Sequence, residues 1–343
     1  MFPYSRILLL GVLVGGCFSP TYPERLACTS TGGCPGDLEC HFDQCVKPGT
    51  DNTPDACVAQ ASTKMFAATG AIEPFSVPTC ITSLVITVIG AGGGGIAGDS
   101  DWGGYPAGQK AEFAVGSGKL VEAGDTLQVL VGMRGQDATD ATGNNPGPQS
   151  GGSGGGGSFV IGADNTPLII AGGGGGATFL AFESGYFEGR IGGDGGVSRG
   201  GMNGGGDNGG MGGVAGNGGT TGIIVGEFHG GTAGGGLTTS GVGNSSGNTT
   251  AHGTANQPGS GFLQGGAGGV AGSAGRNGGF GGGGSAGATG GGGGGYSGGG
   301  AGGTPNAAQS QAGGGGGSFN VGINQETLHP DPDRDGEVII VWN

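Results

Sequence analysis

Residues that carry out catalysis are few and scattered in this chain of 343 residues. Its four histidines, at positions 41, 229, 252 and 329, lie far outside the short spacing of a metal site. Strings of the form G-x-G-x-x-G occur, but none follows a strand and opens a helix, as a dinucleotide site requires. G-x-S-x-G strings likewise lack an accompanying acid and histidine. The chain is therefore predicted not to be an enzyme and to need no cofactor, with a hydrolase hidden in a β fold as the alternative.

One acidic cluster has the spacing of a cation site. Asp331, Asp333 and Asp335 alternate ahead of a glycine, as at the start of a calcium-binding loop. The bidentate glutamate of such a loop is missing, because Trp342 stands at its twelfth position, and Pro332 restricts the backbone. A polar turn is the favoured interpretation, and weak calcium binding is the alternative.

Aromatic residues offer a second kind of chemistry, stacking on a ligand. Trp102 and Tyr105 lie in a loop, where an exposed pair would stack on sugar rings. Five more aromatics are spaced through a glycine-rich stretch, where packing is favoured over a role as binding anchors. They are Phe228, Phe262, Phe280, Tyr296 and Phe319.

Charge narrows the range of partners. The chain has 11 basic and 25 acidic residues, which gives a formal net charge of −14, and its charged fraction is 10%. Nucleic acids and anionic membrane surfaces attract basic proteins, so no nucleic-acid partner is expected.

The first residues read as an export signal. An apolar run follows Arg6 and ends in Val14-Gly-Gly-Cys17, and it is too short to span a bilayer. This ending resembles the lipobox of bacterial lipoproteins, which implies a signal peptide over 1–16, cleavage before Cys17 and lipid attachment to that thiol. Phe18 after the cysteine favours the outer membrane in that family. A plain signal peptide with an incidental cysteine is the alternative.

A cysteine-rich module follows a tether over 17–27. Four cysteines in C-x5-C-x5-C-x4-C spacing lie within 28–46, a segment too small for its own core, which favours disulfides over zinc. It resembles short modules near the N-terminus of myxobacterial lipoproteins. The expected pairs are Cys28–Cys40, Cys34–Cys45 and Cys57–Cys80, although six cysteines allow 15 pairings.

Strands are predicted beyond a polar linker at 47–64. Apolar, β-branched runs bounded by glycine and polar turns mark them. They cover 83–89, 110–115, 126–131, 158–161, 167–171 and 337–342, with a further short one at Ile223–Val225.

Between these strands the chain is about two-fifths glycine from 151 to 317, against an average of about 7%. Glycine disfavours helix and supplies no side chains for a core. Two states remain, a flexible coil or extended strands of three residues per turn whose backbones bond to one another. The terminal strand 337–342 needs partners that precede this stretch, which favours a folded insertion at about 172–317 within a domain of 65–343.

The strand motifs carry a resemblance. Val85–Gly95, Leu127–Gly132 and Leu168–Gly176 look like the glycine-rich domain of the anaplastic lymphoma kinase and leukocyte tyrosine kinase receptors. The resemblance implies an all-β fold, a tumour-necrosis-factor-like or jelly-roll sandwich carrying a polyglycine-II bundle. Receptor signalling is not implied, because no kinase follows.

Together these features predict a non-enzymatic, lipid-anchored protein of the cell envelope. Its N-terminal lipid would hold it in the outer membrane, and its glycine-rich domain would serve a structural or recognition role. The alternative is an adhesin or receptor-like module that binds an extracellular peptide or polysaccharide.

Overall fold

The computed structural model shows an all-β protein in two compact units, Met1–Val58 and Ala59–Asn343. Helical structure within the described residues is limited to short 3-10 turns, η1 (Ser100–Trp102), η2 (Ala163–Asn165) and η3 (Phe262–Gln264). The structure describes residues 26–27, 33–41, 44–47, 60–96, 100–138, 151–181, 187–224, 230–243, 256–272, 275–304 and 311–343.

The first unit contains a small three-stranded antiparallel sheet. Its strands are β1 (Leu26–Ala27), β2 (Glu39–His41) and β3 (Gln44–Val46), in the order β1-β3-β2. A disulfide joins Cys34 to Cys45, and the side chain of Cys45 is fully buried.

Two more cysteines, Cys40 and Cys80, are also disulfide-bonded. Cys28 and Cys57, their expected partners, and Cys17, the expected lipid site, lie outside the described residues.

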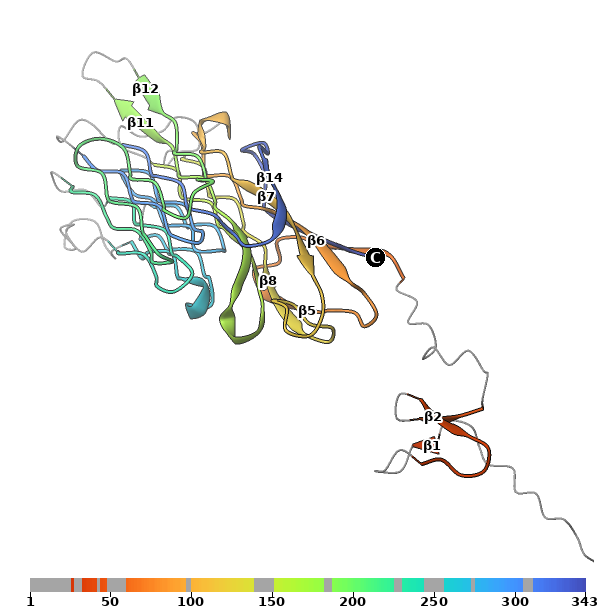
Figure 1. Ribbon diagram of the computed structural model, residues 1–343. Coiled ribbons are helices and arrows are strands. Elements are labelled where there is room, and N and C mark those ends of the chain that lie inside the picture. Colours follow the sequence, from red (N-terminus) through yellow and green to blue (C-terminus); the bar gives the residue numbers. More distant parts are fainter. Residues whose placement is uncertain are drawn as a thin grey trace, which may run out of the picture. The chain divides into compact units, whose positions relative to one another are not determined.

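The second unit is built on two five-stranded antiparallel sheets (Figure 1). The first sheet has the order β14-β7-β6-β15-β4, from β14 (Ile323–Leu328), β7 (Gly108–Ala114), β6 (Ser83–Ile89), β15 (Glu337–Trp342) and β4 (Ser62–Phe66). The second has the order β13-β10-β9-β8-β5, from β13 (Phe319–Asn320), β10 (Pro167–Ala171), β9 (Ser158–Ile161), β8 (Thr126–Leu130) and β5 (Ile72–Ser76). A hairpin of β11 (Thr178–Ala181) and β12 (Phe187–Arg190) stands apart from both.

The core between the two sheets follows from alternation along the strands of the first sheet. In β6 the side chains of Leu84, Ile86 and Val88 are fully buried, whereas those of Val85 and Thr87 are half-buried. The inward residues pack with apolar side chains of β7, β15, β8 and β10 in one cluster. Alternation of this kind is typical of a sheet with one covered face.

In the second sheet β9 and β10 are buried on both faces, because part of the glycine-rich stretch covers their outer side. There Leu130, Phe159 and Ile170 pack with Leu237 and Phe262 in a second apolar cluster. This explains why β9 and β10 read as continuous apolar runs rather than alternating ones.

The aromatics of the glycine-rich stretch belong to this contact. The ring centroid of Phe262 lies 5.1 Å from that of Phe159, and Tyr296 stacks on Phe319 at 4.6 Å. Phe280 packs against the same cluster. Packing is thus what the described aromatics do, and Phe228 lies outside the described residues.

Several strands differ from expectation. The short strand expected at Ile223–Val225 was a wrong prediction for its described residues, because Ile223 lies outside any sheet and is highly exposed. Of the strands in the two five-stranded sheets, β4, β5, β13 and β14 were not predicted, because β4 and β14 are mostly exposed, β5 contains Pro74 and β13 has only two residues. The short strands of the first unit and the β11–β12 hairpin were not predicted either. The strand β4 also begins inside the segment expected to be a linker.

The glycine-rich segments run side by side next to the sandwich (Figure 1). Successive backbone groups of one segment form hydrogen bonds with different neighbouring segments in turn. Six successive amides of the segment 290–295 donate to three neighbouring segments, and each neighbour is met again every third residue. The acceptors are, in order, the carbonyls of Gln311, Gly152, Thr232, Gly314, Gly155 and Gly235, at 2.9–3.3 Å.

The carbonyls of the segment 172–177 show the same three-residue repeat of hydrogen-bond partners. Its six carbonyls accept, in order, from the amides of Ala107, Gly316, Gly155, Gly104, Gly313 and Gly152, at 2.8–2.9 Å. A Cβ on Gly174 or Gly176 would fall well inside 3.0 Å of a neighbouring backbone carbonyl. We call this network of mutually bonded glycine segments the backbone lattice. Glycine is required in its interior because backbone fills the space of a side chain.

Candidate ligand-binding cavity

The acidic cluster near the C-terminus faces an arginine. The Asp333 carboxylate lies 3.1 Å from Nε of Arg134, and Asp335 accepts a hydrogen bond from the Arg134 amide at 2.7 Å. Asp137 pairs with Nη2 of the same guanidinium at 2.7 Å. The Nε and Nη2 atoms of Arg134 are buried. They lie close to the two carboxylates, but the geometry is not that of a hydrogen bond.

Those contacts favour the polar turn over the calcium site. Asp333 pairs with the Arg134 guanidinium, Asp335 accepts from the Arg134 main-chain amide, and Asp331 is exposed. Within the described residues, no group of three or more metal-ligating side chains comes together.

The two aromatics expected to stack on sugars have different surroundings in the structure. Trp102 ends η1 and is partly buried, and its carbonyl accepts from the Gly192 amide at 3.0 Å. Tyr105 is 43% exposed and lines a cavity to which Trp102 does not contribute.

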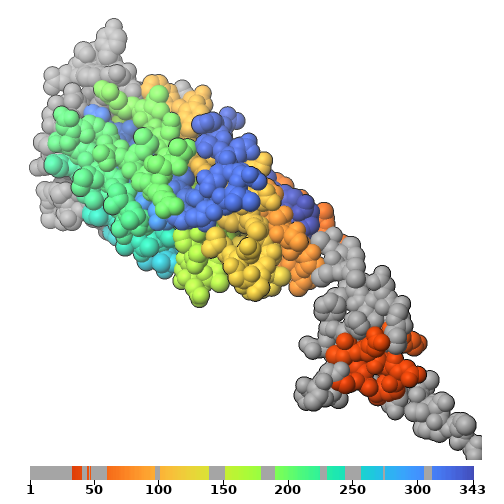
Figure 2. All heavy atoms as spheres, viewed as in Figure 1, coloured from red at the N-terminus to blue at the C-terminus, as the bar shows by residue number. Residues whose placement is uncertain are grey.

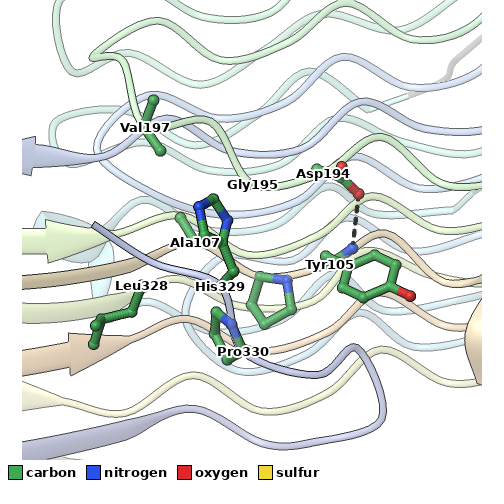
Figure 3. A pocket seen from close by; sticks show the side chains of 9 residues that line it. Tyr105, Ala107, Asp194, Gly195, Val197, Leu328, His329 and Pro330 are labelled. Atoms are coloured by element: carbon green, nitrogen blue, oxygen red, sulfur yellow. Dashed lines mark hydrogen bonds between the residues drawn. The ribbon is translucent and has the colours of Figure 1, made fainter.

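This cavity, of about 340 Å³, is the strongest candidate site in the described part of the chain (Figure 3). Three segments meet there, 105–107 before β7, 194–197 in the backbone lattice, and 328–330, which starts at the last residue of β14. The lining residues are Tyr105, Pro106, Ala107, Asp194, Gly195, Val197, Leu328, His329 and Pro330.

Backbone bonding fixes the relative position of two of these segments. The amide of Gly195 donates to the carbonyl of Tyr105 at 2.7 Å, and the amide of Tyr105 donates to Oδ1 of Asp194 at 3.1 Å. Ala107 is buried and bonds through its amide to Gly172 at 2.9 Å. Two of the three segments that line the cavity are therefore hydrogen-bonded to each other and to the backbone lattice.

The third segment comes from the first sheet. Leu328, the last residue of β14, pairs with Gly108 of β7, and Pro330 follows two residues later. Proline has no amide for the ladder, so the strand ends and the chain turns away. His329 is thereby left exposed at the mouth of the cavity.

The chemistry of the lining suits binding rather than covalent catalysis. Asp194 supplies one carboxylate, His329 one imidazole and Tyr105 one phenol, and the other six lining residues are glycine or apolar. Within the described residues Asp194 forms no ion pair. Neither cysteine nor serine lines the cavity, so no common nucleophile stands beside the imidazole.

Of these residues, sequence reasoning had singled out Tyr105 alone. Asp194 and His329 are far apart in the chain, and each is isolated among glycines or turn residues. Their meeting depends on how lattice segments stack against β14, which the sequence does not encode in any local pattern.

The sequence contains a three-residue repeat that the predictions did not use, and it lies in the segment 208–223, a layer at the surface of the lattice. From 208 to 223 the chain places a larger residue at every third position, usually between pairs of glycines, at Asn208, Met211, Val214, Asn217, Thr220 and Ile223. Met211, Val214 and Ile223 are 65%, 67% and 64% exposed. A period of three is that of an extended strand with three residues per turn. The layer belongs to the face coloured green in Figure 2.

Side-chain oxygens accept hydrogen bonds from amides of this layer. Oγ1 of Thr220 accepts from the Met211 amide at 2.8 Å, and Oδ1 of Asn203 accepts from the Gly212 amide at 2.9 Å. They satisfy amides at the surface of the lattice.

Among the described residues, no helix has the length and apolar character needed to cross a bilayer. The chain matches no family model, and no curated protein is recognisably similar to it in sequence.

Proposed function

We propose that the chain is a non-enzymatic, lipid-anchored protein of the cell envelope that displays a rigid glycine-rich β domain for a structural or recognition role. The observation that carries the proposal is the backbone lattice. It places many surface segments in fixed positions with few side chains of its own, and such a scaffold presents loops and surface residues without a large core.

We infer that the lattice is a polyglycine-II bundle. In an extended strand with three residues per turn, successive amides point in three directions, so partners recur every third residue. The recurrence along 290–295 and 172–177 supports this geometry.

For the sandwich we infer a jelly-roll or tumour-necrosis-factor-like topology. The chain changes sheet between β4 and β5, between β5 and β6, between β7 and β8 and between β13 and β14, and β15 lies between β6 and β4. These crossings, with the motif resemblance, support kinship to the glycine-rich domain of the receptor kinases.

Export is supported by the disulfide chemistry. Disulfides persist in oxidising compartments, and Cys34, Cys45, Cys40 and Cys80 are all disulfide-bonded. Together with the expected signal over 1–16, this supports a place outside the cytoplasm, held by lipid on Cys17 at the outer membrane.

Lipid labelling in a Gram-negative host tests the anchor. The full chain, grown with a radiolabelled or alkyne-bearing fatty acid, is expected to take up label and to fractionate with outer membranes. Cys17→Ser should abolish both, whereas the matched variant Ser19→Ala should behave as wild type. An unlabelled wild-type chain, or a Cys17→Ser chain that still takes up label, would contradict the anchor.

The second candidate function, an adhesin or receptor-like binding module, is favoured by the cavity around Asp194. A hollow of about 340 Å³ with a few polar groups in a mostly apolar lining has the character of a small-molecule or side-chain site.

A further inference from the structure

We propose that the cavity around Asp194 binds a primary ammonium on an aliphatic stem, as carried by a lysine side chain of an extracellular peptide. The proposal rests on the recognition role proposed above and names the chemistry of its ligand.

The first argument is the state of the carboxylate. Asp194 is exposed at the cavity, where it accepts one hydrogen bond, from the Tyr105 amide to Oδ1. An ionised carboxylate has about four lone-pair sites, so most of its acceptor capacity remains open. Within the described residues no lysine or arginine pairs with it.

The second argument is a further hydrogen-bond acceptor in the same cavity. An ammonium has three donors and no acceptor. His329, when neutral, has one acceptor nitrogen, and it lines the same cavity as Asp194 (Figure 3). An ammonium that donates to Asp194 and to His329 would have one donor left, which could bind water at the mouth of the cavity.

The third argument is the apolar part of the lining. Pro106, Val197, Leu328 and Pro330 offer aliphatic surface around the polar pair. A lysine stem has four methylenes, which bury against such surface while the charged end meets the carboxylate.

The same features disfavour other ligands. None of the nine lining residues is lysine or arginine, so phosphates and carboxylates find no counter-charge. The net charge of −14 repels anions and attracts cations over a distance. A neutral sugar would present many hydroxyls to a lining with three side chains that can hydrogen-bond.

Titration of the full-length chain tests the proposal, by calorimetry or by chemical-shift perturbation at pH 8. The probes are Nα-acetyl-lysine amide, the norleucine analogue that lacks the ammonium, and cellobiose. We expect the lysine probe to bind saturably, about 10-fold more tightly than the norleucine probe, the size expected of one charge-assisted hydrogen bond.

The key variant is Asp194→Asn, which keeps an oxygen for the Tyr105 amide and removes the charge. It should weaken binding of the lysine probe about 10-fold, without lowering the melting temperature. The matched control is Asp207→Asn, which removes an exposed carboxylate elsewhere in the lattice and should leave the affinity within about 2-fold.

Several results would overturn the proposal. Equal binding of the lysine and norleucine probes would show that the cavity recognises only apolar surface. Equal effects of the two variants would show that binding depends on net charge rather than on Asp194. Cellobiose binding in preference to the lysine probe would make this a sugar site, and no saturable binding would leave no amine site. Because the labelling of Cys17 does not involve the cavity, either proposal can fail alone.

Discussion

The second unit, Ala59–Asn343, contains two regions that are stabilised in different ways. In the sandwich, side chains such as Leu84, Ile86 and Ile340 are fully buried between sheets, and the hydrophobic effect dominates. In the backbone lattice, buried glycines have no side chain to bury, and their amides and carbonyls bond to neighbouring segments.

The difference teaches where each region can accept change. A side-chain core tolerates swaps that conserve volume, because its fit depends on total size and shape. In a backbone lattice the interior glycines cannot be replaced by larger residues. Substitution is tolerated only at the position of each three-residue turn that points outward. That position carries residues as different as Met211, Val214 and Asn217.

The largest expected effect comes from adding one methyl group inside the lattice. Gly174→Ala would push Cβ into the backbone around Gly104, which cannot rotate aside as a side chain can. We expect a loss of at least about 4 kcal/mol of unfolding free energy, above the usual cost of overpacking, or failure to fold. Denaturant unfolding or the yield of folded protein measures it.

The control for this change is Gly200→Ala, where the nearest atom to a new Cβ is 3.9 Å away and φ is not positive. It should alter stability by less than about 1 kcal/mol. If both alanines were equally harmless, the lattice would be looser than the structure indicates.

A large-to-small change in the sandwich is expected to cost less. Leu84→Ala removes a fully buried side chain and should lower the unfolding free energy by about 3 kcal/mol. The exposed Leu120→Ala should cost under about 1 kcal/mol.

Thermal unfolding of Leu84→Ala also sharpens the comparison. The amide of Ala91, just after β6, bonds to the lattice at Gly156, so both regions should melt in a single transition. Two separate transitions would show that they fold independently.

A smaller effect is expected at the lattice surface. Thr220→Val keeps the shape of the side chain but removes the oxygen that accepts from the Met211 amide, and should cost about 1 kcal/mol. Thr221→Val is the control, because that hydroxyl forms no hydrogen bond within the described part of the chain. Equal costs for the two variants would mean that solvent replaces the side-chain acceptor.

The smallest expected effect is none. Since Asp333 pairs with the Arg134 guanidinium and Asp335 accepts from the Arg134 main-chain amide, a calcium chelator should leave the melting temperature of the chain unchanged. A fall in melting temperature that added calcium reverses would restore the cation site, and magnesium serves as the control for ionic strength.

Much of the sandwich was predictable from the sequence, because its strands are apolar and bounded by turns. The runs at 83–89, 158–161, 167–171 and 337–342 coincide with β6, β9, β10 and β15. The edge strands escaped because tertiary pairing, rather than local pattern, makes β14 extend beside β7. An exposed run such as that of β14 carries no apolar signal.

The candidate site was less predictable, for a physical reason. A cavity in a backbone lattice depends on which glycine segments are neighbours, and glycines carry no side chains to specify a partner. Asp194 and Tyr105 are joined by a main-chain amide rather than by a side-chain pair, so their residue types gave no clue.

Amide hydrogen exchange along 290–295 tests the central claim, that the glycine stretch is held by its own backbone, most directly. Each of these amides is bonded to a neighbouring segment, so protection should approach that of Leu84–Val88 in β6. Exchange at the rate of a free peptide through 290–295, with the β6 amides still protected, would contradict the account and leave a flexible insertion between ordered strands.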